Sequence, residues 1–85
     1  MSENTGMSQS VARRVAAVFG EVSVKSGVTP PPLKADTVLD SSLGLESMDF
    51  AEIVVRLEKE FGKDPFASAD LPEVLTFGDL VRLYE

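Results

Sequence analysis

The strongest constraint on the fold is an amphipathic segment that spans residues 47 to 61. At the period of an α-helix, the apolar side chains of this segment fall in one narrow stripe, and charged side chains gather on another face. This pattern predicts a helix that packs against a core, and Gly62 and Pro65 are expected to end it. The stripe consists of Phe50, Ile53, Val54, Leu57 and Phe61, and the charged face, which we expect to be solvated, of Asp49, Glu52, Arg56, Lys59 and Glu60.

An earlier helix fits residues 8 to 25, because apolar residues recur there at three- and four-residue spacing. Ser8 or Ser10 can cap its start. Gly27 and the prolines at positions 30–32 stop it, since glycine suits a left-handed turn and proline cannot continue a helix. Its apolar side consists of Val11, Val15, Val18, Phe19 and Val22.

Residues 28 to 46 predict a long ordered loop that is pinned to the core by apolar side chains. A short helix is expected around residues 69 to 74. A last helix is marked by Thr76 and Asp79, which stand in the spacing of a capping box. The loop's apolar residues are Val38, Leu39, Leu43 and Leu45, and those of the last helix are Phe77, Leu80, Val81 and Tyr84.

The chain of 85 residues has room for one domain, which we place at residues 8–85 after a flexible N-terminus at residues 1–7. It contains no cysteine and no histidine. Disulfides, thiolate metal sites and the usual pairs of nucleophile and base are therefore excluded. We expect neither a catalytic site nor a metal site.

The net charge of −6 argues against binding to nucleic acid or to anionic membrane surfaces. Residues 1 to 42 are balanced in charge, so the acidic excess lies in residues 43 to 85 and offers basic partners a surface. The apolar stretches are too short for a membrane span, and the first residues lack a signal-peptide pattern. We expect a cytoplasmic monomer that does not insert into membranes.

The segment LGLESMDF, residues 43 to 50, places Ser47 where the long loop meets the strongest helix. Position alone favours a capping role for this serine, because serine is among the preferred residues at the start of a helix. A hydroxyl there also projects outward, close to the unpaired amide donors of the first turn. Leu43 and Leu45 are expected to be buried anchors of the loop.

The run LGLESMDFAEIVVRLEKEFG, residues 43 to 62, closely resembles the phosphopantetheine attachment region of acyl carrier proteins. In that family an aspartate-serine-leucine triplet opens the second helix, and Glu46, Ser47 and Met48 occupy the triplet here. The resemblance extends more weakly over residues 8 to 85. It implies an all-α, four-helix bundle with a short third helix, which holds acyl or aminoacyl intermediates and catalyses nothing itself.

The resemblance also implies that a phosphopantetheinyl transferase moves 4'-phosphopantetheine from coenzyme A onto Ser47, using magnesium. A phosphodiester at this position would lie near the positive end of the helix dipole. Gly44 would let the chain turn tightly and leave the serine open to the transferase, or it is simply a loop glycine. Because the chain has no cysteine, the cofactor would supply the only thiol.

Met48, Ala51 and Val55 lie close to the serine but off the core stripe, where a purely solvated face would carry polar residues. Packing at the edge of the core is one explanation. The other is a docking patch for the transferase and for acyl-loading and acyl-transferring enzymes. In that hypothesis Asp49 and Glu52 steer basic surfaces toward the patch.

Arg56, Lys59 and Lys63 interrupt a region that tends to be strongly acidic in carriers of fatty acid synthesis. This departure favours a specialised carrier in polyketide, peptide, aminoacyl or lipid-modification chemistry. An unmodified helical interaction module with the same fold is the alternative. A hydrolase that uses Ser47 is disfavoured, because no histidine is present to activate the hydroxyl.

Overall fold

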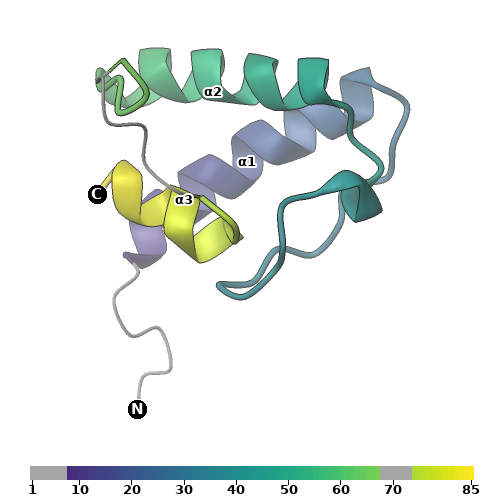
Figure 1. Ribbon diagram of the computed structural model, residues 1–85, viewed down its shortest axis with the longest axis horizontal. Coiled ribbons are helices and arrows are strands. Elements are labelled where there is room, and N and C mark those ends of the chain that lie inside the picture. The colour runs from purple at the N-terminus through teal and green to yellow at the C-terminus, as the bar shows by residue number, and fades with distance from the viewer. Residues whose placement is uncertain (1–7, 68–73) are drawn as a thin grey trace.

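The computed structural model describes residues 8–67 and 74–85, and within them the regular elements are helical (Figure 1). They are α1 (Gln9–Lys25), the short 3-10 helix η1 (Ser41–Leu43), α2 (Ser47–Phe61) and α3 (Phe77–Leu83). The predicted all-α class is confirmed. The helix expected at residues 69 to 74 lies outside the described residues except for its last position, so the count of four helices stays a prediction.

The ends of α1 follow from local chemistry. The Ser8 hydroxyl accepts a hydrogen bond from the backbone N–H of Val11 at 3.3 Å, so Ser8 and not Ser10 is the cap. At the other end Gly27 adopts the left-handed conformation, with φ of +78°, directly after the last capped turn. The predicted limits of this helix are therefore confirmed to within one residue.

α2 runs over the same residues that the amphipathic pattern predicts, and it ends at Gly62 in the left-handed conformation with φ of +66°. Figure 1 shows α1 crossing behind α2 at an oblique angle, with the short α3 near the N-terminal half of α1. The long loop after α1 turns back beneath α2 before it reaches Ser47 (Figure 1).

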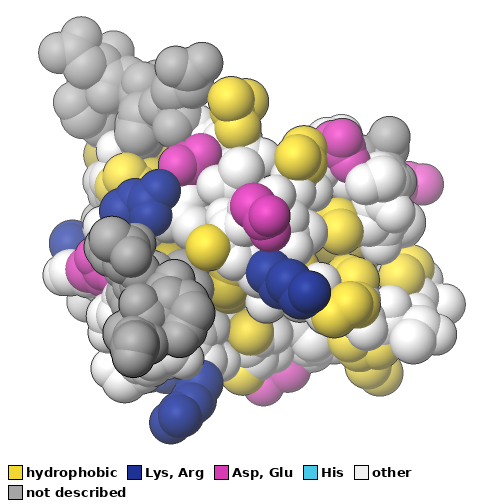
Figure 2. Space-filling model, turned by 90° about the horizontal axis from the view of Figure 1, so that it is seen from below, with side chains coloured by type: hydrophobic (Ala, Val, Ile, Leu, Met, Phe, Trp, Pro, Cys, Tyr) yellow, Lys and Arg dark blue, Asp and Glu magenta, His cyan; other side chains and the backbone are white. Residues whose placement is uncertain are grey.

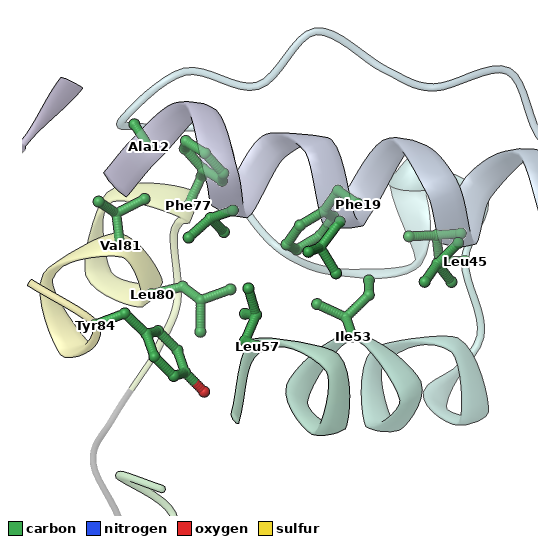
Figure 3. Close-up of a cluster of buried hydrophobic side chains, with 12 residues drawn as sticks. Ala12, Phe19, Leu45, Ile53, Leu57, Phe77, Leu80, Val81 and Tyr84 are labelled. Atoms are coloured by element: carbon green, nitrogen blue, oxygen red, sulfur yellow. The ribbon is translucent and has the colours of Figure 1, made fainter. Parts of the chain in front are cut away.

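The core lies between these helices and is centred on Phe19 of α1, which is 1% exposed. The Phe19 ring meets Phe50 of α2 edge-on at 6.3 Å between ring centroids, and Phe77 of α3 at 6.1 Å. Figure 3 shows Ile53 and Leu57 pointing from α2 toward α1. The residues expected on the core face of each helix are buried or packed against the core, apart from the half-buried Val54.

α3 begins with the predicted capping box. The Thr76 hydroxyl accepts from the N–H of Asp79 at 3.2 Å, and the Asp79 carboxylate accepts from the N–H of Thr76 at 3.0 Å. The four apolar residues expected on its inner side are all buried. The sequence pattern therefore identified both the start and the buried face of this helix.

The long loop is fastened to the start of α3 by backbone hydrogen bonds that the sequence did not reveal. The N–H of Phe77 donates to Thr37 O at 2.8 Å, and that of Gly78 donates to Ala35 O at 2.9 Å. A single antiparallel bridge joins Val38 to Thr76. The first-turn amides of a helix lack intrahelical acceptors, so the loop carbonyls satisfy them. We call residues 35–39 and 75–78 together the loop strap.

Alanine substitutions at two helical glycines are predicted to have opposite effects, because Gly78 belongs to the loop strap and Gly20 does not. A Cβ at Gly78 would lie 2.8 Å from Ala35 O, so Gly78→Ala should lower the free energy of unfolding by about 1–3 kcal/mol. A Cβ at Gly20 of α1 would meet no atom within 4 Å, so Gly20→Ala should raise it by up to about 1 kcal/mol. Urea denaturation measures both, and equal stabilities of the two variants would contradict the close approach.

Candidate functional site

Ser47 is the first residue of α2 and its side chain is exposed. The capping role that position alone suggested for it is wrong, because Glu46 is the N-cap residue. The first amides that donate within the helix are those of Asp49 and Phe50, which both bond to Glu46 O, at 2.9 and 3.1 Å. The amides of Ser47 and Met48 therefore come before the first amide that donates within the helix, and they are available to an external acceptor.

The loop before Ser47 is held by a buried leucine and a left-handed glycine. Leu45 is buried in the core, as predicted, and Leu43 packs against it as a half-buried neighbour. Gly44 between them has φ of +82°, a conformation that a side chain would strain. Only one residue separates the buried Leu45 from the exposed Ser47, so this turn brings the serine out of the core.

Asp49 ties the first turn of α2 to the end of α1. Its carboxylate accepts hydrogen bonds from the backbone N–H of Glu46 at 2.9 Å and from the Ser26 hydroxyl at 2.6 Å. These two bonds, the backbone one foremost, lower the pKa of Asp49 below its ordinary value. Asp49 is thus an ionised structural group at the helix start, where negative charge is favourable.

Glu52 is held between two cations. Its Oε2 lies 2.9 Å from Lys25 Nζ of α1 and 2.8 Å from a guanidinium nitrogen of Arg56. Arg56 also reaches Glu21 of α1 at 3.0 Å. The hydrogen bonds from Lys25 and then Arg56 lower the pKa of Glu52, so this carboxylate is ionised and paired.

The face of α2 predicted to be solvated is therefore largely a seam with α1. Asp49, Glu52 and Arg56 are half-buried there, while Lys59 and Glu60 are exposed. Glu60 continues the seam, because Arg14 of α1 lies 2.9 Å from its carboxylate. The interpretation of these residues as a freely solvated face is wrong for the three half-buried members, since α1 supplies partners that the sequence of α2 alone cannot reveal.

A separate face of α2 is exposed and apolar. Met48 is 78% exposed and Val55 49%, and Ala51 between them is also exposed. Spacings of three and four residues place these side chains on one face of the helix, next to Ser47. We call Met48, Ala51 and Val55 the apolar patch. Its exposure rules out the explanation that these residues pack at the edge of the core.

The site fits a phosphodiester on the serine, because it combines an exposed hydroxyl with helix-start amides that have no acceptor in the helix.

Among the described residues no group of three acidic, histidine or cysteine side chains could hold a metal ion. Within the same residues no helix has the length and apolarity needed to cross a membrane. Figure 2, seen from the side opposite α2, shows charges of both signs scattered among apolar side chains rather than one basic surface.

Comparison with known proteins identifies the family of the chain. The family model described as a phosphopantetheine attachment site matches residues 13–84, which include all of α2. The acyl carrier protein of Thermotoga maritima is 34% identical over 64 residues, which cover 75% of this chain and 78% of that protein. The chain belongs to the acyl carrier protein family. The acyl carrier protein of Azobacteroides pseudotrichonymphae is also 34% identical, over 80 residues that cover 93% of this chain and 88% of that protein.

Membership in the acyl carrier protein family establishes the general activity. The chain carries acyl groups, is not an enzyme, and bears covalently attached 4'-phosphopantetheine as its prosthetic group. This group supplies the thiol that the chain lacks. No solved structure matches the chain significantly.

The structure adds residues to the site that sequence reasoning missed. Lys25 of α1 pairs with Glu52, and Ser26 at the C-cap of α1 donates to Asp49. Glu21 of α1 pairs with Arg56. The pairing of Glu52 with Arg56 could have been found, because opposite charges four residues apart on a helix are neighbours. The contacts with α1 carried no such local signal.

The hydrogen bonds to Asp49 predict a specific dependence on pH. Because its pKa is lower in the folded chain than in the unfolded one, Asp49 stabilises the fold above the unfolded pKa, and this stabilisation is lost as pH falls through the folded value. NMR titration of the carboxyl carbon should show this low midpoint. Ser26→Ala should raise it only part of the way, since the Glu46 N–H remains.

The matched control for that titration is Ser42→Ala. The Ser42 hydroxyl donates to Asp40 in the loop and not to Asp49. This substitution should leave the midpoint of Asp49 unchanged. A midpoint of Asp49 at its ordinary value in the wild-type chain would show that its hydrogen bonds do not persist in solution.

Proposed function

We propose that Ser47 is the attachment point of 4'-phosphopantetheine, and that residues 8–85 form an acyl carrier domain. The observation that carries the proposal is an exposed serine at the first position of α2, inside the region that matches the attachment-site family. In this proposal a phosphopantetheinyl transferase is the first partner, and acyl-loading and acyl-transferring enzymes follow.

The residues around Ser47 have distinct roles in this proposal. The amides of Ser47 and Met48 stabilise the phosphate, because both come before the first amide that donates within the helix. The left-handed Gly44 and the buried Leu45 fix the turn that exposes the serine. Glu46 supplies the acceptor for the first turn of α2. The cofactor on Ser47 would supply the thiol to which the cargo is linked.

We further propose that the apolar patch receives the partner enzymes. The patch adjoins Ser47 and is exposed, so a partner that covers it would also reach the cofactor. Burial of its side chains would supply the favourable contact area. Arg56, Lys59 and Lys63 on the same helix and just beyond it support a specialised pathway, including aminoacyl, peptide, polyketide or lipid-modification chemistry. A cytoplasmic monomer remains our expectation for this carrier.

The attachment proposal predicts a change in mass. Incubation with coenzyme A, magnesium and a broad-range phosphopantetheinyl transferase should add one phosphopantetheine unit to the wild-type chain and none to Ser47→Ala. Ser42→Ala, which removes an exposed loop hydroxyl, should be modified like the wild type. Intact-protein mass spectrometry provides the measurement. If several transferases leave the wild-type chain unchanged, the unmodified interaction module becomes the better account.

The docking proposal predicts that a charge in the apolar patch impairs transfer. Val55→Asp should raise the KM of the transferase for the carrier, because the aspartate must lose its hydration when a partner covers it. Val24→Asp is the matched control, since Val24 is 67% exposed on α1, outside the patch. Equal KM values for the two variants would remove the patch from the docking surface.

A further inference from the structure

We propose that Lys25 and Arg56 determine partner selectivity by neutralising Glu52, so that the surface beside Ser47 fits a partner with an apolar, weakly charged docking face. This inference rests on the proposed attachment at Ser47 and docking on the apolar patch. It replaces the hypothesis that Asp49 and Glu52 act as free acids that steer basic partners.

The first support is the engagement of both acids. Glu52 Oε2 lies 2.9 Å from Lys25 Nζ and 2.8 Å from the Arg56 guanidinium. Both oxygens of Asp49 accept hydrogen bonds, one from Ser26 and one from the Glu46 backbone. A basic side chain of a partner would have to displace Lys25 or Arg56 before it could pair with Glu52 Oε2, and the two cations would repel it from the rest of the carboxylate.

The second support is the charge that a partner meets on the outward face of α2. Lys25 and Arg56 offset the charges of Glu52 and Glu21 at distances of 3.0 Å or less. Opposite charges this close cancel each other's field at longer range. Lys59 continues the line of the apolar patch, is exposed, and forms no ion pair with any described side chain. With Glu46 and Asp49 included, four acids stand against the three cations Lys25, Arg56 and Lys59, so the face beside the patch keeps only a small net negative charge.

The size of the effect follows from the exposure of the pair. The Lys25 side chain is 63% exposed and that of Glu52 30%, so the pair is screened by solvent and its loss should not unfold the chain. Removing Lys25 would leave Glu52 with Arg56 as its remaining partner, and should therefore strengthen binding to a basic docking face by roughly two- to fivefold. The change should appear in KM at low salt and fade at high salt, because salt screens exposed charges.

The experiment uses a phosphopantetheinyl transferase with a basic docking face and the full chain as its substrate. Lys25→Ala should lower the KM for the carrier roughly two- to fivefold at low salt, leave kcat unchanged, and make KM more sensitive to sodium chloride. Lys25→Arg should keep the wild-type KM, because it retains the positive charge. Lys34→Ala is the control, since it makes the same change in net charge on the long loop.

A double variant separates the neutralisation of Glu52 from a general charge effect. Adding Glu52→Gln to Lys25→Ala should return KM and its salt dependence toward the wild-type values. Lys25→Gln, which keeps an apolar stem, gives the same comparison should the alanine variant prove unstable by circular dichroism. Equal KM values for Lys25→Ala and Lys34→Ala would overturn the inference. Absence of modification of the wild-type chain would overturn the proposed attachment instead.

Discussion

The edge-on contacts of Phe19 with Phe50 and Phe77 are the interaction on which the arrangement of the three helices depends. One buried ring of α1 thereby contacts both α2 and α3. Once α2 packs against this ring, the opposite side of α2 faces solvent. Ser47, the first residue of α2, is exposed as well. The exposed site is thus a consequence of how the core is packed.

The polar seam between α1 and α2 follows from the same packing. With Phe50 set against Phe19, the charged residues of α2 come beside the basic and acidic residues of α1, from Arg14 with Glu60 at one end to Ser26 with Asp49 at the other. Exposed ion pairs of this kind add little to stability individually. Their main effect here is on which charges remain available at the surface next to Ser47.

Much of the fold could be predicted because its signals are local. The limits of α2, the capping box of Thr76 and Asp79, and the buried face of α3 depend on residues within a few positions of one another. The pairing of Lys25 with Glu52 joins residues 27 positions apart and depends on how the two helices are rotated, which periodicity does not specify. The hydrogen bond from Gly78 to Ala35 O likewise has no sequence signature. The exposure of Ser47 was predicted correctly, but its relation to the cap was not, because Glu46 is not a typical capping residue.

The loop strap has a consequence for how the molecule opens. α3 has only seven residues, too few to be stable as an isolated helix, and its first amides bond to Thr37 and Ala35 of the loop. Release of the C-terminal helix would leave those carbonyls without their donors, so the two segments should open together as one cooperative unit. The same loop continues through Leu45 to Ser47. Docking of α3 against the loop should therefore also keep the residues before Ser47 ordered.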